Sequence, residues 1–365
     1  MKIICNKSDL TQAVNIVSKA VAVRATISVM ECILFSAKDG EIKMTANNNE
    51  LGIETIVNGR IEEEGMIALD AKIISEIIRK LPENEVEIST DEKFTTTIVC
   101  EKSQFKITGH SGEDFSFLPN IEKNDAVEIS QFSLKEIIRQ TLFSVADNEN
   151  NIVMTGELFE IKGNKLQVVS LDGHRVSIRN LELNDTYGDK KVIVPGKTLN
   201  ELNKILPGDA DEIVQLFFSE NHIVFIYDET TVVSRLIDGQ FIDVTRMISS
   251  DYETKVTVNK KELLECIDRA TLLAKEGDKK PIIMNISDDQ MEIKMNSFIG
   301  SMNEEIEIQK EGKNLTIGFN PMFFIDVLRV IEEEEVSLYM INYKYPCFIK
   351  DEKESFIYMI LPVNL

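Results

Sequence analysis

Apolar residues recur every three to four positions in several short segments of the chain, the spacing of one face of an α-helix. Three of these segments read as a strand end followed by an amphipathic helix. Their sequences are "LDAKIISEIIRKL", "VPGKTLNELNKIL" and "FNPMFFIDVLRVI", and they begin at residues 69, 194 and 319, always 125 residues apart. In the first, Ile73, Ile74, Ile77, Ile78 and Leu81 are predicted to form the buried face. The constant spacing indicates an internal repeat.

A second pattern, a strand followed by a polar turn and a helix, also occurs three times, beginning at residues 1, 127 and 256. Aligned on Leu10, Leu134 and Leu263, its copies lie 124 and 129 residues apart. The chain therefore consists of three units of about 125 residues, each with two helices. We expect domains at residues 1–122, 126–248 and 253–365, with polar linkers at 120–125 and 249–254.

Segments in which apolar and polar residues alternate follow the helices and predict strands. They are "EVEIST", "TTTIVC" and "QFKITG" in the first unit, "IVQLFF", "HIVFIY" and "TVVSRLI" in the second, and "EVSLYMI", "PCFIK" and "SFIYMILPV" in the third. One short helix per run of strands predicts an α+β fold rather than a doubly wound parallel sheet.

Composition changes this picture in two ways. The formal net charge of -22 argues against a nucleic-acid partner, but only weakly, because net charge does not say where the cations lie. Basic residues recur on all six predicted helices, where they are mixed with acids, so each helix by itself reads as a solvated face. A symmetric array of such helices would nevertheless present one basic stripe on an acidic protein.

The five cysteines are widely spaced and odd in number, which favours buried reduced thiols over disulfides or a zinc site. The segment "MKIICNKSDL" lacks the apolar core of a signal peptide, and no apolar run reaches the ~18 to 20 residues that a membrane span requires. We expect a soluble, cytoplasmic protein.

The stretch "SLDGHRVS" at residues 170–177 is the candidate for chemistry, since it carries His174, one of three histidines, beside Asp172 and Arg175. One hypothesis is a hydrolase centred on His174 with Asp172. No motif supplies a nucleophile, a phosphate-binding loop or a metal-ligand set, and adjacency in sequence does not make a catalytic pair. A structural turn is therefore the more plausible interpretation of these residues alone. A third hypothesis for the whole chain is a structural oligomer of acidic repeats.

The three repeats, taken with "SLDGHRVS", "LIDGQFIDVTRMI", "IGFNPMFFIDVL" and the final "YMILPVNL", resemble the bacterial DNA polymerase III beta subunits, the sliding clamps of replication. The resemblance covers the whole chain. It implies three clamp domains, each with two helices and antiparallel sheets, in a head-to-tail homodimer that forms a ring around double-stranded DNA. It also implies no catalysis and no cofactor. Its partners would be the replicative polymerase, the clamp loader and repair proteins.

The resemblance implies that the helices line the DNA channel. Arg24 matches a DNA-contacting arginine of the family, and Asn148 falls at a second polar contact. The other candidate channel residues are the helical cations Lys72, Arg79, Lys80, Lys135, Arg139, Lys197, Lys204, Arg269 and Arg329. Contacts of this kind would be electrostatic and independent of base sequence, as sliding requires.

The resemblance also implies a groove between the second and third domains that binds short peptides, usually a Gln followed by apolar residues. Its residues would be Met154, Leu171, Gly173, His174, Arg175, Val176, Ile242, Arg246, Met247, Asn320, Phe323, Pro346, Met359, Leu361, Pro362 and Val363. Relatives often have proline at Ile242, arginine at Asn364 and threonine or serine at Leu171, so we expect a shifted motif preference. Pro362 is expected to end the last strand and leave the tail free.

The seam of the ring is expected to involve Leu272 and Leu273 at the end of a helix in the third domain. Phe105, at the edge of the first domain, is their expected partner surface.

Overall fold

The computed structural model describes residues 1–24, 27–147, 149–273 and 280–364, and its strands pair antiparallel throughout these ranges. The chain packs as two compact units. One contains Met1–Leu134 and Glu201–Leu236, and the other contains Lys135–Asn200 and Ile237–Leu365.

Six α-helices lie within the described ranges and follow the predicted repeat. They are α1 (Lys7–Val17), α2 (Ala71–Lys80), α3 (Gln131–Thr141), α4 (Gly196–Ile205), α5 (Lys260–Thr271) and α6 (Pro321–Val330). The boundary between the two packing units falls within α3 and within α4. None of the described helices is long and apolar enough to cross a membrane.

Short polar side chains fix where several helices begin. Asp70 accepts a hydrogen bond from the Ile73 amide at 2.8 Å at the start of α2, and Asn259 accepts one from the Glu262 amide at 3.0 Å at the start of α5. Asn320 accepts one from the Met322 amide at 3.1 Å, ahead of Pro321 in the first turn of α6. Each cap satisfies an amide that the helix itself leaves without a partner.

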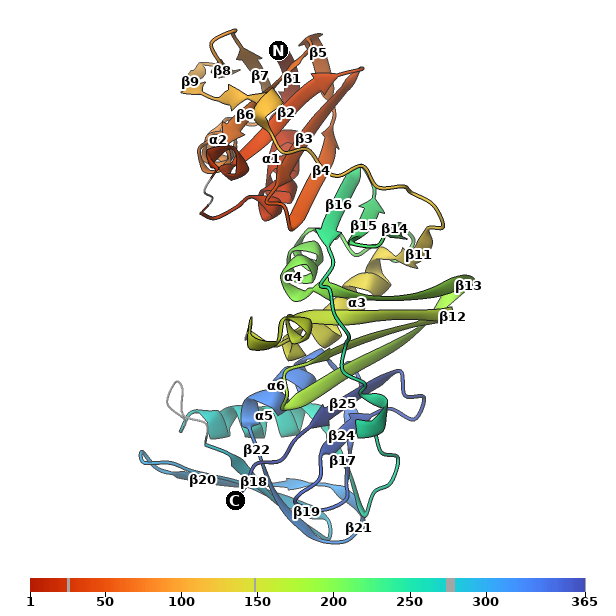
Figure 1. Ribbon diagram of the computed structural model, residues 1–365. Coiled ribbons are helices and arrows are strands. Elements are labelled where there is room, and N and C mark those ends of the chain that lie inside the picture. Colours follow the sequence, from red (N-terminus) through yellow and green to blue (C-terminus); the bar gives the residue numbers. More distant parts are fainter. Residues whose placement is uncertain (25–26, 148, 274–279, 365) are drawn as a thin grey trace. The chain divides into compact units, whose positions relative to one another are not determined.

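The first unit contains two sheets (Figure 1). The smaller has the order β5 (Gly59–Glu63), β1 (Lys2–Asn6), β7 (Glu85–Thr90), β8 (Thr95–Cys100) and β9 (Ser103–Thr108). The larger has the order β10 (His110–Ser111), β6 (Gly65–Asp70), β2 (Cys32–Lys38), β3 (Glu41–Asn47), β4 (Leu51–Val57), β16 (Thr230–Arg235), β15 (His222–Tyr227), β14 (Ile213–Phe218) and β11 (Val127–Ser130).

The second unit also contains two sheets. One has the order β12 (Gly156–Leu171), β13 (Arg175–Pro195), β25 (Phe356–Ile360), β24 (Cys347–Lys350), β23 (Glu335–Met340), β17 (Thr254–Asn259) and β21 (Gln309–Gly312). The other has the order β20 (Ser301–Glu307), β19 (Gln290–Asn296), β18 (Ile282–Ser287) and β22 (Leu315–Phe319).

Each sequence repeat shares a sheet with the next one, which is why the packing units do not coincide with the repeats. In the larger sheet of the first unit, β4 of the first repeat pairs with β16 of the second. In the second unit, β13 of the second repeat pairs with β25 of the third. The backbone ladder thus continues from one repeat into the following one, and the predicted strands β7–β9, β14–β16 and β23–β25 all form.

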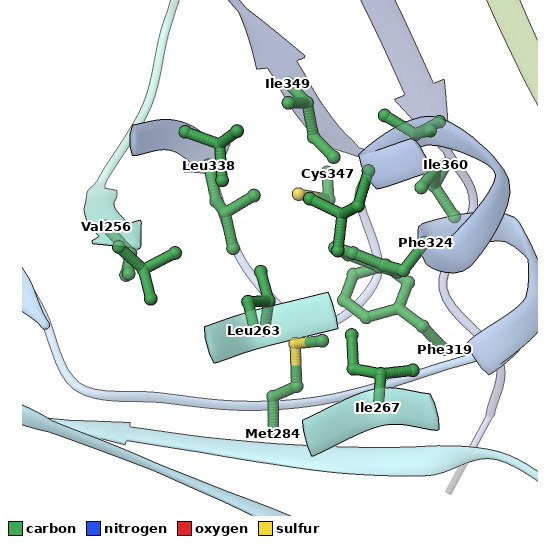
Figure 2. Packing of buried hydrophobic residues seen from close by; sticks show 14 of the residues in the cluster. Val256, Leu263, Ile267, Met284, Phe319, Phe324, Leu338, Cys347, Ile349 and Ile360 are labelled. Atoms are coloured by element: carbon green, nitrogen blue, oxygen red, sulfur yellow. The ribbon is translucent and has the colours of Figure 1, made fainter. Parts of the chain in front are cut away.

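The core of the third repeat lies between its helices and its strands (Figure 2). Leu263 and Ile267 of α5 and Phe324 of α6 are fully buried against residues of the surrounding strands, among them Met284 and Cys347. All five cysteines are free and buried, as predicted. One expectation for the buried face of α2 is wrong, because the Ile73 side chain is 48% exposed.

Candidate functional site

The turn between β12 and β13 is built around the side chain of Asp172. Its Oδ1 accepts hydrogen bonds from the amides of His174 at 2.9 Å and Arg175 at 3.1 Å. Gly173 has a φ of +90°, a conformation that residues with a Cβ rarely adopt. The Asp-Gly pair therefore specifies a tight turn locally.

Arg175 connects this turn to two other elements of the second unit through hydrogen bonds of its guanidinium group. Its Nε donates to Asp172 Oδ2 at 2.9 Å and its Nη1 donates to Asp326 Oδ2 of α6 at 2.6 Å, while Nη2 donates to the Phe143 carbonyl. The guanidinium also lies over the Phe323 ring at 4.6 Å from its centroid. Arg175 was predicted as part of a groove, but its charged group is already bound to groups of the chain itself.

Apolar residues of the predicted groove gather beside this turn. Leu171, Val176 and Met359 are buried in one cluster, and Met154, Ile242 and Leu361 pack against it while remaining partly exposed. The His174 ring stacks on Phe323, with centroids 6.1 Å apart. The structure thus brings together residues from β12, β13, β25, α6 and the segment after residue 237. Among these apolar residues, Met154, Ile242 and Leu361 remain accessible at the surface, whereas Leu171, Val176 and Met359 are buried.

The C-terminal tail is held in place, contrary to the expectation that it is free. The Leu361 amide donates to the His174 carbonyl at 2.9 Å, and the Val363 amide donates to the Gly318 carbonyl at 2.9 Å. Pro362, between them, has no amide hydrogen to donate. The last strand ends here, but the tail continues across β22 through a single bridge.

The remaining predicted groove residues lie on separate elements. Arg246 and Met247 are exposed on a short 3-10 helix, Thr245–Met247, with Arg246 Nε 3.7 Å from Asp243 Oδ2. Asn320 caps α6, and Pro346 directly precedes β24. Asp326 and Phe143 were missed by the sequence reasoning. Arg175 implies a partner for its charge, but nothing in the sequence says which carboxylate supplies it.

The geometry gives Asp172 a structural role. Its two oxygens accept from two backbone amides and from the Arg175 guanidinium, so the carboxylate orients the turn rather than the imidazole of His174. A general base in a catalytic pair needs a hydrogen bond from its ring to the orienting carboxylate. The only hydrogen bond between the two residues within the described chain is from the backbone amide of His174.

The predicted cations of the helices are mostly exposed, and several of them pair with acids of their own helix. Lys80 Nζ lies 3.6 Å from Glu76, Arg139 Nη2 lies 2.5 Å from Glu136 and Lys204 Nζ lies 2.6 Å from Glu201. Arg79 also contacts Glu76, Arg269 contacts Glu304 and Arg329 lies 3.7 Å from Asp268. The remaining predicted helical cations are Lys72, Lys135 and Lys197. Arg24 is exposed after α1, and Asn148 lies outside the described residues.

The predicted seam residues lie at or near two open sheet edges. Phe105 is exposed on β9, the last strand of its sheet, and Leu272, 77% exposed, follows α5. Leu273 is half-buried against the core of the third repeat. Phe298 and Ile299, at the turn between β19 and β20, are also exposed, at 95% and 56%. The sequence reasoning missed these two, although "NSFIGS" between two alternating segments is a visible signal.

Comparison with known proteins places these features in a family. Models of the N-terminal, central and C-terminal domains of the DNA polymerase III beta subunit match residues 1–119, 128–243 and 245–364. The curated beta sliding clamp of Staphylococcus epidermidis is 34% identical over 357 residues, which cover 95% of this chain and 94% of the relative.

Two solved structures agree over the full length. That of a putative DNA polymerase III beta subunit from Eubacterium rectale is 64% identical and covers 100% of both chains, with a TM-score of 0.97. The DNA polymerase sliding clamp of Bacillus subtilis is 34% identical, covers 100% of this chain and 99% of its own, and also has a TM-score of 0.97. The chain, with its three repeats, belongs to the DNA polymerase III beta subunit family, the bacterial sliding clamps.

Proposed function

We propose that this protein is a processivity clamp: two copies close head to tail around duplex DNA and tether the replicative polymerase to it. The observation that carries the proposal is the match of all three domain models, in order, along residues 1–364. Members of this family work on DNA without base recognition, which suits a chain whose helical cations are balanced by neighbouring acids. The protein would act in the cytoplasm, where bacterial DNA is replicated.

Two open strand edges support closure of the ring. Within the described residues β9 ends one sheet of the first unit and β20 ends one sheet of the second. An open edge presents unpaired amides and carbonyls that a strand of another copy can complete. Lys102 and Lys106 lie at or beside β9, and Glu305 and Glu307 lie on β20, so opposite charges would meet when the two edges pair.

The helices would line the channel with weak, exchangeable contacts to phosphates. Lys72 and Lys197 are exposed and have no ion pair within the described part of the chain, whereas Arg79, Lys80 and Lys204 share acids of their own helices. Such mixed faces attract DNA without holding it in one register. The other proposed contacts to phosphates follow from the same reasoning and are made by Arg24, Lys135, Arg139, Arg269 and Arg329.

The cluster around His174 would bind linear peptides of the polymerase, the clamp loader and repair proteins. Met154, Ile242 and Leu361 offer partly exposed apolar surface over a buried floor, and the stacked pair of His174 and Phe323 forms one side. Apolar side chains supply buried area, and a few polar groups orient the ligand. The rest of the candidate groove, from Arg246 and Met247 to the tail, would contribute rim contacts.

The protein would perform no chemistry of its own. The competing hypothesis, a hydrolase centred on His174 with Asp172, is disfavoured because Asp172 accepts hydrogen bonds from two backbone amides and from Arg175. A plain structural oligomer is disfavoured by the family match.

The test of encirclement is topological. A clamp loader should place the protein on a nicked circular plasmid, where it should remain during gel filtration, and cutting the plasmid once should release it within minutes. Linear DNA of the same length with both ends blocked by bound protein is the control and should retain it. Equal retention on open linear and circular DNA would contradict encirclement.

A further inference from the structure

A cavity of about 150 Å³ lies in the first packing unit, where the first repeat meets the second. It is formed by a turn after β3, the segment 116–119 and strands β15 and β16. Its lining residues are Asn47, Asn49, Glu50, Gly52, Ser116, Phe117, Leu118, Pro119, His222 and Val233. A cavity of this size accommodates a single side chain rather than a drug-sized molecule.

The turn at this cavity has the same hydrogen bonds as the Asp172 turn. Asn48 Oδ1 accepts from the amides of Glu50 at 3.0 Å and Leu51 at 2.9 Å, as Asp172 Oδ1 accepts from the second and third residues after it. Asn47 pairs with Gly52 across the turn, as Leu171 pairs with Val176. Glu50 is thus the repeat counterpart of His174.

The strand that borders the turn is equivalent as well. The Arg235 amide donates to the Glu50 carbonyl at 2.8 Å, and the Leu361 amide donates to the His174 carbonyl at 2.9 Å. Val233 therefore takes the place of Met359, opposite Gly52. The chain therefore forms the same arrangement twice: a turn, the strand that borders it and a crossing segment, which is residues 116–119 in the first copy. The second copy is the proposed peptide groove.

The first copy differs in the side chains that shape it. Asn47 Nδ2 donates to the Ser116 carbonyl at 2.9 Å, which fixes the crossing segment. Gly52 lets Leu118 lie directly on its backbone, since a Cβ there would be 2.1 Å from Leu118 Cδ2. Leu118 thus forms the floor, and Phe117, 56% exposed, stands at the rim.

Polar groups with unused hydrogen-bonding capacity face this cavity. The exposed carboxylate of Glu50 and the imidazole of His222 make no side-chain hydrogen bond or ion pair within the described chain. Burial, and then the nearby Arg235, lower the pKa of His222, so its ring is neutral at pH 7 and offers one donor and one acceptor. Asn49 Nδ2 has only a weak contact, 3.8 Å, to Met30 Sδ.

We propose that this cavity is a second docking site for a linear peptide, which inserts a side-chain amide between Glu50 and His222 and lays an apolar neighbour on Phe117. A primary amide carries both a donor for the Glu50 carboxylate and an acceptor for an N–H of His222 or Asn49. An acidic side chain would be repelled by Glu50, and a cationic one has no acceptor for an N–H of His222 or Asn49. The inference rests on the proposed function in one respect, namely that the ligand is a linear peptide.

The two histidines allow each site to be observed separately in the full-length protein. His174 reports the proposed groove and His222 reports the cavity, while the exposed His110 on β10 serves as reference. An acetylated peptide Ala-Gln-Leu-Phe would be titrated to about 10 mM, which detects millimolar affinity, while imidazole resonances are followed by NMR. We expect His222 to shift saturably and His110 to remain unchanged.

Two comparisons test the chemistry. Replacing Gln by Glu in the peptide should weaken binding at His222 about fivefold, the effect of one partly exposed charge. Glu50→Gln keeps an acceptor but removes the charge, so it should abolish the preference for the Gln peptide over the Glu peptide. Glu92→Gln, at an exposed position between β7 and β8, is the control and should keep this preference. Phe117→Ala should weaken binding of both peptides.

A His222 resonance that does not respond to the Gln peptide overturns the inference, whatever His174 does. A His222 response that is equal for both peptides in the unchanged protein also overturns it, because the amide would then not be recognised. A response of His222 with none at His174 would support the second site and contradict the proposed groove.

Discussion

Glu157 is the most unusual single residue of the second unit. Its side chain on β12 is fully buried, and neither carboxylate oxygen has a hydrogen-bond partner among the described residues. Burial raises the pKa of Glu157 well above its ordinary value of 4.5. A hydrogen bond from the Thr141 hydroxyl would lower the pKa, but that hydroxyl donates its proton to the Ile137 carbonyl at 2.8 Å, which leaves burial as the dominant cause. The folded protein therefore favours the protonated form of Glu157 over a wider pH range than the unfolded chain does.

A raised pKa in the fold makes stability depend on pH. The contribution of protonated Glu157 is complete below pH 4.5 and is lost as pH rises through the folded-state pKa, by up to about 1.4 kcal/mol per pH unit. Glu157→Gln should match the parent in acid and have a higher free energy of unfolding at pH 8. Urea unfolding at several pH values measures this. Glu182→Gln, at an exposed position of β13, is the control, and an unchanged pH slope in Glu157→Gln would contradict the assignment.

At the scale of elements, the turn between β19 and β20 and the end of α5 both expose apolar side chains. Phe298, Ile299 and Leu272 belong to one repeat. Leu273 lies close to Gly300 of the same turn, since its Cδ2 would be 3.7 Å from a Cβ added to that glycine. Exposed apolar groups beside an open strand edge indicate an interface. Leu272 is the better residue for a test than Leu273, because Leu273 also packs against the core.

Leu272→Asp should place an unpaired carboxylate in the proposed seam and convert the dimer into a folded monomer. Light scattering measures the mass, and circular dichroism checks that the fold persists. Phe132→Asp, which places the same charge at an exposed apolar position on α3, should remain dimeric. A dimer of unchanged affinity in Leu272→Asp would show that the seam lies elsewhere.

At the scale of the whole molecule, charge is the main constraint on function. A formal charge of -22 repels DNA overall, so binding requires that the cations act together on one surface. In the proposed ring, the Lys and Arg residues that recur on the helices of two copies would meet this requirement. The same recurrence on isolated helices would give a solvated face without function.

Neutralising Arg24 and three of these helical cations should weaken DNA association. In the variant with Arg24, Arg79, Lys197 and Lys204 changed to alanine, loading onto nicked circles should fall. The slope of log K against log salt concentration should shrink by about 0.9 for each phosphate that the protein no longer neutralises. A variant with four exposed lysines off the helices changed to alanine, Lys38, Lys123, Lys165 and Lys353, is matched in net charge and should behave like the parent. Identical slopes in both variants would contradict a helical channel.

The sequence by itself determined the local structure and the repeat. Helix and strand periods are properties of neighbouring residues, so α2, α4 and α6 and the strands after them could be predicted, and the Asp172–Gly173 turn follows from two residue types. The three-unit organisation followed from spacing alone.

Tertiary structure decided which distant residues meet. The pairing of β4 with β16 and of β13 with β25 joins the repeats, and Arg175 reaches Asp326, 151 residues away. Ile73 is exposed although its spacing predicts a buried position, and Glu157 is buried although it is a carboxylic acid. A period states which residues share a face, but it does not state what covers that face. That depends on the register of remote strands, which no short stretch of sequence contains.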